Sequence, residues 1–436
     1  MRRYVIIGMG VAGMAAAEAI RARDRDATIS LVGDDPYGFY SKPGLAYYLT
    51  GELPEKQLLL NSKQDWQELN LTYVKGRAVN ILPQEHLVDL GTAEALPYDR
   101  LLLATGATAV QLNAPGADLD GVVKLDHFED ARRILRLARK ARVAVVVGGG
   151  ITALELAEGL ARRKVAVHYF LRGNRYWGNV LDEVESRIVE KRLEEEGIRL
   201  HYQTELAEVL GRRGKVTGVR STSGETIHCG MVAVGIGIRP RLELAQTTGL
   251  RTERGILVNE YMQSSEVDIF AAGDVAQVYD PLARQFILDS LWNPAREQGS
   301  TAGANMAGQT QAYRKTAPFN VTRLAGLTTT IIGAVGGGRD DDLVSIARGD
   351  SETWRLLPNA IAREVGEAVN HMRLMVGEQT LLGALVMGDQ TLSRPLQELI
   401  AAQVDITPLR SALLAPDNTL GDRVMDFWKA WRTNVS

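Results

Sequence analysis

The sequence predicts an α/β protein of three domains. A unit of strand, glycine-rich turn, helix and strand occurs twice, and the chain beyond residue 318 lacks it. With 436 residues, 45% of them hydrophobic and 24% charged, the chain is long enough for two or three domains with ample cores. We expect the first domain to comprise residues 1–112 and 245–315, the second residues 113–244 and the third residues 316–436.

The first unit opens the chain. Its parts are a short buried strand, a glycine turn, an alanine-rich helix and a second strand, at residues 4–7, 8–13, 14–23 and 28–32. The first glycine of such a turn permits tight bending, the second lets the backbone approach a pyrophosphate and the third lets the helix pack on the strand. These glycines are Gly8, Gly10 and Gly13. The order of elements indicates a Rossmann-like dinucleotide-binding unit.

An acid and a helix complete that unit. The helix N-terminus offers N–H groups and the positive end of its dipole to phosphates. Asp34, or Asp35 beside it, follows the second strand and would accept hydrogen bonds from a ribose.

The second unit repeats the first. A strand at residues 143–147 is followed by a turn at 148–153, a helix at 154–163 and a strand at 165–171. Two units imply two nucleotides, or one nucleotide and a decayed copy. The intact glycines of the second turn favour two nucleotides.

Further strands and helices are expected around these units. A loop at residues 36–45 follows the first unit, and a helix at 182–196 belongs to the second domain. A buried strand ending in Gly273-Asp274 should return the chain to the first domain. Beyond residue 318, strands such as 328–332 and 371–376 precede a helical end, which predicts a mixed α and β domain.

Composition excludes several classes of protein. The formal net charge is −3, with 50 basic and 53 acidic residues well mixed, so no nucleic-acid footprint is present. A single cysteine excludes a disulfide framework. The first strand begins too early for a signal peptide, and no apolar run approaches the roughly 20 residues that span a bilayer, so we expect a cytoplasmic protein. We interpret the run from Gly336 to Asp342 as an exposed turn and predict no metal site.

Six motifs in order resemble the two-dinucleotide flavoproteins, namely the pyridine nucleotide-disulfide oxidoreductases and their ferredoxin, rubredoxin and nitrite reductase relatives. They span residues 4–308 and begin at Gly8, Ala104, Val145, Val234, Ala271 and Trp292. The resemblance implies a glutathione reductase-like fold with FAD on the first domain and NAD(P)H on the second. It also implies an α+β interface domain at the C-terminus, on which such proteins form homodimers.

The resemblance also implies site residues. The FAD ligands would be Gly8, Gly10, Gly13, Asp34, Asp35, Lys42, Thr105, Gly106, Asp274, Trp292 and Gln298. The NAD(P) ligands would be Gly148, Gly150, Ala153, Glu155, Arg172, Arg175 and Gly235. Glu155, where nicotinamide would meet flavin, and Lys42 are the candidate catalytic residues. The helix that opens after Trp292 would aim its N-terminus at the flavin pyrimidine edge.

The chain departs from its relatives in the loop at residues 39–51. Coenzyme A-disulfide reductases and NADH oxidases carry a cysteine before the Gly-Leu of this loop, and here that position is Pro43. Proline can be neither nucleophile nor redox group. The sole cysteine, Cys229, is interpreted as a small buried residue. Lys42 replaces the arginine of cysteine-free relatives, and Tyr47 replaces a lysine that pairs with the glutamate matching Glu155 in some of them.

The second strand of the second unit bears on the choice of nucleotide. An acid at its end would bond the 2′-hydroxyl of NAD, whereas a nearby arginine accommodates the 2′-phosphate of NADP. Leu171 occupies the acid position, and Arg172 and Arg175 follow. This pattern resembles NADPH-dependent glutathione reductases, so we predict a preference for NADPH.

The resulting hypothesis is an FAD-dependent NAD(P)H:acceptor oxidoreductase without a redox-active cysteine. Its acceptor would be a ferredoxin- or rubredoxin-like protein, a quinone or oxygen. Two alternatives are a flavin-bearing redox sensor or scaffold of the apoptosis-inducing-factor type, and an NAD(P)H oxidase or disulfide reductase. An aromatic stripe at residues 422–432 could contact a membrane, a dimer partner or its own domain.

Overall fold

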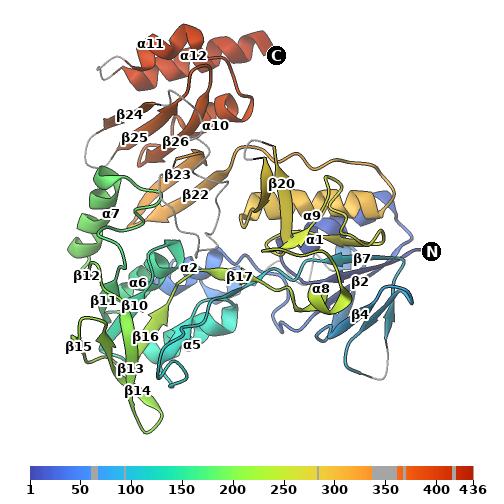
Figure 1. Ribbon diagram of the computed structural model, residues 1–436, viewed down its shortest axis with the longest axis horizontal. Helices are drawn as coiled ribbons and strands as arrows, with labels where there is room; N and C mark the ends of the chain where they lie inside the picture. The colour runs from blue at the N-terminus through green and yellow to red at the C-terminus, as the bar shows by residue number, and fades with distance from the viewer. Residues whose placement is uncertain are drawn as a thin grey trace.

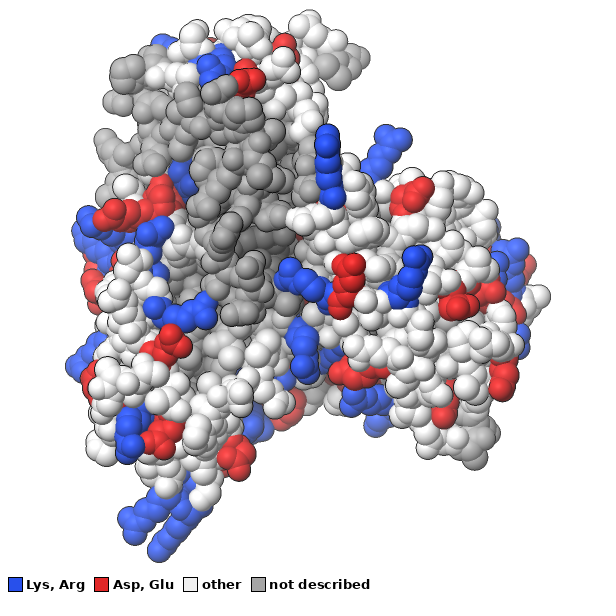
Figure 2. Space-filling model, viewed as in Figure 1, with Lys and Arg blue, Asp and Glu red and all other residues white. Residues whose placement is uncertain are grey.

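The computed structural model describes residues 1–59, 67–92, 95–281, 284–335, 361–366, 370–414 and 419–435. Figure 1 shows three lobes, two of them built on parallel sheets and the third at the C-terminal end of the chain. The α/β class predicted from the sequence is therefore confirmed. On the face in Figure 2, basic and acidic side chains are interspersed over the described surface.

The first lobe is a five-stranded parallel sheet in the order β19-β7-β1-β2-β3. Its strands are β1 (Arg3–Ile7), β2 (Thr28–Gly33), β3 (Thr72–Lys75), β7 (Arg100–Leu103) and β19 (Ile269–Ala271). The central strands are apolar almost throughout because helices and loops bury both faces of the sheet. As predicted, the segment before Gly273 pairs with β7 and returns the chain to the first sheet.

Two helices of this lobe, α1 (Val11–Arg23) and α9 (Trp292–Met306), lie against each other at unusually short range. A Cβ atom on Gly299 would lie 2.1 Å from the carbonyl oxygen of Ala12, and one on Gly303 would lie 2.4 Å from that of Ala16. Only small residues allow this approach, which explains the alanine and glycine content of both helices.

The second lobe is a parallel sheet in the order β12-β11-β10-β16-β9. Its strands are β9 (Val122–Lys124), β10 (Val143–Val147), β11 (Ala166–Phe170), β12 (Arg199–His201) and β16 (Met231–Val234). Its helices are α5 (Phe128–Ala138), α6 (Ile151–Arg162) and α7 (Glu183–Glu195). An antiparallel sheet of β13 (Leu206–Arg212), β14 (Lys215–Ser221) and β15 (Thr226–Ile227) joins the same hydrophobic core as Val145 and Phe170.

The helices after both glycine turns begin three residues earlier than the sequence indicated, at Val11 and Ile151. Gly10 and Gly150 are extended N-cap residues directly before them. The expected starts at residues 14 and 154 were therefore wrong, because the turn contributes the first helical turn itself. This brings the helix N-termini to the ends of the strands.

Two short antiparallel strands, β8 (Ala107–Ala109) and β17 (Ile238–Pro240), connect the lobes. The other described elements that precede α9 belong to two small sheets and three short helices. They are β4 (Asn80–Leu82), β5 (Leu87–Asp89), β6 (Leu96–Pro97), β18 (Ile256–Leu257), β20 (Ala276–Asp280), β21 (Gln285–Leu288), α2 (Gly44–Thr50), α3 (Glu55–Leu58) and α8 (Glu243–Thr248). Helix α2 packs on α6 of the second lobe (Figure 1).

The third lobe is an antiparallel sheet in the order β22-β23-β26-β25-β24. Its strands are β22 (Phe319–Leu324), β23 (Leu327–Gly333), β24 (Ile361–Gly366), β25 (His371–Val376) and β26 (Leu381–Met387), and its helices are α10 (Ser393–Ala401), α11 (Thr407–Leu413) and α12 (Leu420–Val435). The turn interpreted at residues 336–342 lies outside the described residues.

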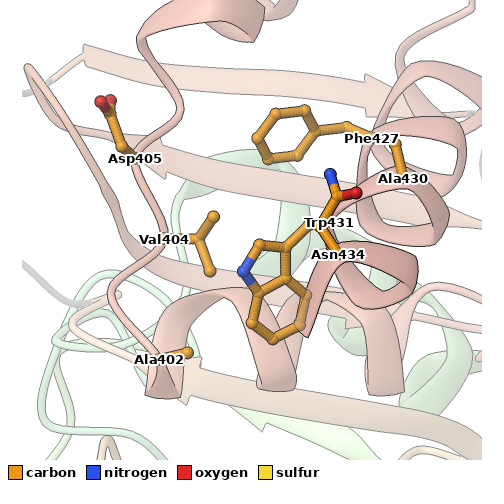
Figure 3. A pocket seen from close by; sticks show the side chains of 7 residues that line it. All are labelled: Ala402, Val404, Asp405, Phe427, Ala430, Trp431 and Asn434. Atoms are coloured by element: carbon orange, nitrogen blue, oxygen red, sulfur yellow. The ribbon is translucent and has the colours of Figure 1, made fainter. Parts of the chain in front are cut away.

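The aromatic stripe belongs to α12 and packs on its own domain. Val424 is fully buried, and Phe427, Trp428 and Trp431 contact the same core. The Trp428 Nε1–H donates a hydrogen bond of 2.8 Å to Glu398. Figure 3 shows Phe427 and Trp431 lining a surface pocket with Val404. In the described part of the chain, every helix is too short or too polar to cross a bilayer.

Candidate functional site

The first glycine turn is shaped by close backbone contacts. Gly8 has φ +117°, and a Cβ atom there would lie 2.1 Å from the Ala104 carbonyl oxygen at the end of β7. A Cβ atom on Gly13 would lie 2.2 Å from the Gly8 carbonyl oxygen. Gly10, by contrast, faces open space at the N-terminus of α1. The turn is therefore tight on its protein side and open where a phosphate would approach.

The second glycine turn repeats this geometry. Gly148 has φ +140°, and its Cβ would lie 2.1 Å from the Gly235 carbonyl oxygen at the end of β16. Gly235 is itself fixed, because a Cβ there would lie 2.7 Å from the Ala153 backbone nitrogen. Gly150 faces open space before α6. Both predicted turns thus have the same construction, including the open glycine at the helix N-terminus.

The two candidate ribose ligands occupy different environments. Asp35 accepts hydrogen bonds from the Tyr37 backbone N–H at 2.9 Å and the Tyr40 hydroxyl at 3.1 Å, so it holds the following loop. Asp34 is exposed directly after β2. The geometry therefore favours Asp34 over Asp35 as the residue that would contact a ribose.

The Gly273-Asp274 turn lies beside α9. Gly273 has φ +79°, and its N–H donates to the Gln298 side-chain oxygen at 2.9 Å. Gln298 therefore orients the turn. Asp274 is partly exposed, and burial raises its pKa although the charge of Lys42 opposes the shift. Trp292 is the first residue of α9, and its ring lies 6.1 Å from that of Phe39.

Lys42 lies near a buried carboxylate that the sequence did not reveal. Its Nζ atom is 3.7 Å from Asp126, which also contacts Lys124 Nζ at 3.0 Å and the Thr108 hydroxyl at 2.8 Å. Burial alone would raise the pKa of Asp126, but Lys42 and the other partners hold it well below the usual range. Arg241 lies 3.5 Å away. These residues surround the connection that β8 and β17 form between the lobes. Asp126 belongs to no recognised sequence motif, so the sequence did not predict it.

Other predicted FAD ligands lie at the same connection. The Thr105 hydroxyl donates to the Arg241 carbonyl oxygen at 3.2 Å, and Gly106 has φ +68°. Thr105 and Gly106 therefore form the turn that leads from β7 into β8.

Glu155 lies in the second turn of α6 and is partly exposed. Burial, with the charge of Glu158, raises the pKa of Glu155 to about 8. Glu158 is buried, and burial raises its pKa to about 7. Both folded-state pKa values exceed the ordinary 4.5, so the stabilising contribution of their protonated forms is full below pH 4.5 and is lost as the pH rises through 7 to 8.

Tyr47, which replaces the lysine of some relatives, lies beneath the Arg323 guanidinium at 5.1 Å. Arg323 forms two hydrogen bonds of 2.7 and 2.6 Å with Glu52. This contact joins the end of α2 to β22 of the third lobe. Sequence reasoning missed Glu158 and Arg323, although the three-residue spacing of Glu155 and Glu158 on one helix could have drawn attention to the first.

The predicted NADP phosphate ligands follow β11. Leu171 is buried and Arg172 is exposed directly after it. The Arg175 guanidinium donates to the Gly178 carbonyl oxygen at 3.0 Å. The two arginines therefore lie in the same loop, but Arg175 already serves to hold that loop together.

Cys229 is buried at 6% exposure, and burial raises the pKa of its thiol to about 11. Pro43 is the N-cap residue of α2, and it offers no thiol there. We expect Cys229 to react with a disulfide reagent such as dithionitrobenzoate at pH 8 only after unfolding. Colour development in native protein at the rate seen in urea would contradict this.

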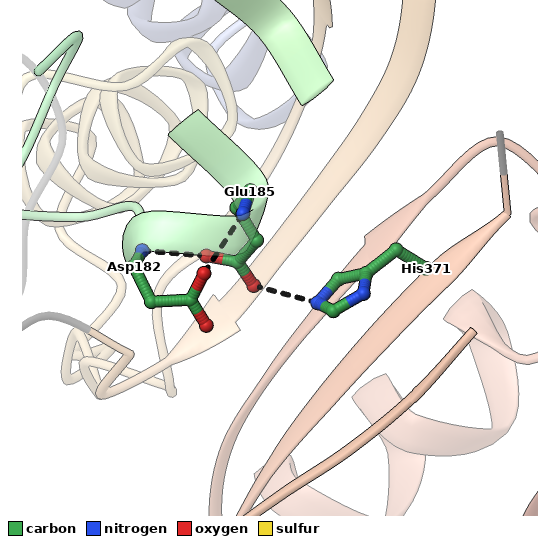
Figure 4. Close-up of side chains that lie close together, drawn as sticks. All are labelled: Asp182, Glu185 and His371. Carbon is green, nitrogen blue, oxygen red and sulfur yellow. Dashed lines mark hydrogen bonds and ion pairs between the residues drawn. The ribbon is translucent and has the colours of Figure 1, made fainter. Parts of the chain in front are cut away.

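One group of side chains could hold a metal by position alone. Asp182, Glu185 and His371 offer ligand atoms within 4.8 Å of one another (Figure 4). Asp182 and Glu185 also form the capping box at the start of α7. However, the Arg373 guanidinium binds Glu185 through two contacts of 2.8 and 2.9 Å. Its charge occupies the place of a cation, and we assign the group to the junction between α7 and β25.

Two tandem glycine turns, each at the end of a parallel sheet, define the class of flavoproteins with two dinucleotide-binding domains. The sequence profile of the pyridine nucleotide-disulphide oxidoreductases matches residues 2–299, and the chain belongs to this family. It is accordingly an oxidoreductase of the FAD- and NAD(P)H-dependent type.

Individual relatives agree with the family. The chain is 32% identical to rhodocoxin reductase of Rhodococcus erythropolis, over 74% of this chain and 78% of that protein. It is 29% identical to rubredoxin-NAD(+) reductase of Pseudomonas putida, over 88% of this chain and 99% of that protein. The covalent putidaredoxin reductase–putidaredoxin complex contains a chain of the same fold, with a TM-score of 0.85 and 24% identity. The match covers 98% of this chain and 99% of that one. The chain spans about half the length of some other curated relatives.

The residues present fit the FAD and NAD(H) that the family implies. Gly10 and Gly150 leave open space at two helix N-termini, while Gly8 and Gly148 permit the tight turns before them. A side chain at any of the four would fill the space or strain the turn.

Proposed function

We propose that the protein transfers a hydride from NAD(P)H, with NADPH preferred, to FAD and then delivers electrons to a small redox protein. The observation that carries this proposal is the matched construction of the two glycine turns, Gly8 against Ala104 and Gly148 against Gly235. Bound FAD would accept the hydride and release its two electrons singly. The buried Cys229 and the proline at position 43 argue against disulfide reduction.

Individual residues have defined tasks in this proposal. The N-terminus of α1 with Gly8, Gly10 and Gly13 holds the FAD pyrophosphate, and Asp34 holds its ribose. The side of the site that would hold the flavin is shaped by Thr105, Gly106, Asp274, Trp292 and Gln298. Lys42 supplies a positive charge near Asp274. The nicotinamide nucleotide would bind at the second glycine turn, which contains Gly148, Gly150, Ala153 and Gly235. Glu155 would lie where the nicotinamide meets the flavin, and its raised pKa of about 8 favours the neutral carboxylic acid there.

The acceptor is proposed from relatives. Rhodocoxin reductase and rubredoxin-NAD(+) reductase carry the names of small electron carriers, which supports a carrier of that kind here. We also propose a homodimer formed through the third lobe, to be tested by sedimentation equilibrium.

Anaerobic titration of the purified protein with NADPH and, separately, NADH tests the function. We expect a flavin absorption spectrum that NADPH bleaches at lower concentration than NADH, followed by reoxidation on addition of a rubredoxin or ferricyanide. A protein without flavin, or a flavin that neither nucleotide bleaches, would contradict the proposal. A long-lived reduced flavin that no acceptor reoxidises would favour the sensor alternative instead.

The choice of nucleotide gives a separate prediction. Arg172→Ala should raise the KM for NADPH by about tenfold, because one charge-assisted contact to a phosphate contributes roughly 1.5–3 kcal/mol. The KM for NADH should stay within about twofold. Arg175→Ala should affect both nucleotides through the loop. Equal changes for both nucleotides in Arg172→Ala would refute NADPH selection by this residue.

A further inference from the structure

Two glutamates of α6 lead from the proposed hydride-transfer site toward the third lobe. Glu155 and Glu158 are three residues apart, so they project from the same face with Cβ atoms about 5–6 Å apart. Glu155 is partly exposed, whereas Glu158 is only 7% exposed and lies in the core of the molecule. A buried acid one turn beyond a site residue has no part in the tasks described above.

The residues that interact with Glu158 belong to helix α6, strand β11, strand β22 with the turn that follows it, and the end of helix α7. On α6 itself, Glu155 and Arg162 interact with it, and on β11 the buried Tyr169 does so. The Gly326 backbone N–H, between β22 and β23, donates a hydrogen bond to its carboxyl group. Arg323 of β22 attracts it but is itself bound to Glu52 beyond α2, and Glu196 at the end of α7 repels it.

Glu196 provides contact with solvent. It pairs with Arg162 at 3.3 Å, and the two side chains are 30% and 58% exposed. Arg162 lies one turn beyond Glu158 on α6 and binds Glu196, so the acids at positions 155, 158 and 196 follow one another along this helix from the proposed site to the surface.

The proposed reaction requires a proton to leave. NAD(P)H and two oxidised one-electron carriers give NAD(P)⁺, two reduced carriers and one proton. The hydrogen that enters the site as hydride therefore departs as H⁺ once per nucleotide. Helices α2 and α6 pack together beside the site.

We propose that Glu158 relays this proton from Glu155 to the solvent beside Glu196. The carboxylic acid of Glu155 gives its proton to the Glu158 carboxylate, which passes it to water at the surface, and the resulting Glu155 carboxylate takes up the proton that the reaction releases. The pKa values of about 8 and about 7 make that transfer nearly balanced at neutral pH. The proposal rests on the proposed function, which supplies the nucleotide and the carrier.

Rapid mixing of the flavin-loaded protein with NADPH and ferricyanide tests the relay. Nicotinamide absorbance reports hydride transfer, and a pH indicator in weak buffer reports proton release. In the native protein we expect both signals to rise together. In Glu158→Gln, whose amide oxygen still accepts from Gly326, hydride transfer should stay within about twofold and proton release should lag by at least about tenfold.

Glu190→Gln is the matched control. Glu190 is also a buried glutamate whose pKa burial raises, but it lies on α7 and accepts a hydrogen bond from the Tyr176 N–H. It should show no lag. Infrared titration provides a second measurement without turnover, in which the carboxylic acid band that disappears between pH 6 and 8 in native protein should lose one component in Glu158→Gln.

The outcomes separate this inference from the proposed function. A native flavin that NADPH does not reduce would overturn the proposed function and the relay with it. A reducible flavin with proton release that keeps pace in Glu158→Gln would overturn the relay alone. Equal slowing of hydride transfer and proton release would assign Glu158 a purely structural part and would also overturn the relay.

Discussion

Replacement of Arg373 by leucine is expected to lower the free energy of unfolding by about 3–5 kcal/mol, because it leaves a buried carboxylate without its partner. Glu185 is fully buried, and Arg373 is 7% exposed. Arg373 also donates to the carbonyl oxygens of Val335 at 2.7 Å and Val180 at 2.8 Å. One side chain therefore satisfies groups from the second and third lobes.

Urea unfolding followed by circular dichroism measures this loss. Arg394→Leu is a suitable control, because the Arg394–Glu398 pair is exposed and its removal should cost no more than about 0.5 kcal/mol. The double variant Glu185→Leu/Arg373→Leu should recover part of the stability, since neither charge is then buried alone. If Arg373→Leu is as stable as the control, the junction does not depend on this ion pair.

Gly299→Ala should destabilise the first lobe by about 3 kcal/mol, the upper end of the usual cost of overpacking, and abolish FAD retention. Its Cβ would lie 2.1 Å from the Ala12 carbonyl oxygen and 2.8 Å from the Ala12 Cα. Both contacts are with backbone, so the helices must separate rather than a side chain move. Because Ala12 lies in the first turn of α1, that separation would displace the N-terminus proposed to hold the pyrophosphate.

Gly421→Ala provides the comparison. Gly421 also lies in a helix, but its nearest neighbour is the flexible end of Leu392 at 3.2 Å. We expect its stability to remain within about 1 kcal/mol of the native protein. The bound FAD per protein chain after gel filtration, together with the thermal midpoint, distinguishes the two variants. Normal FAD content in Gly299→Ala would contradict the importance of the close α1–α9 contact.

Local sequence was sufficient for the parts of the molecule whose physical requirements are local. The two turns were recognisable because a strand, a tight bend and a helix N-terminus occur within some 15 residues, and glycine alone tolerates the backbone approach at Gly8 and Gly148. The strand before Gly273 was assigned to the first sheet, and β19 indeed pairs with β7. The starts of α1 and α6 were misjudged, because each helix already begins within the segment that was assigned to the glycine turn.

Contacts between distant segments were decided only by the tertiary structure. Asp34 and Asp35 are adjacent and chemically alike, and only the position of Tyr40 engages the second of them. Asp126 acquires Lys42 and Arg241 as partners from distant segments, and Arg373 reaches Glu185 across 188 positions of sequence. Periodicity reveals whether a residue is buried but not which charge lies opposite it, because that depends on how the lobes pack. Thus the cofactor turns are inherent in the sequence, whereas the ion pairs and the acid series of α6 exist only once the three lobes have assembled.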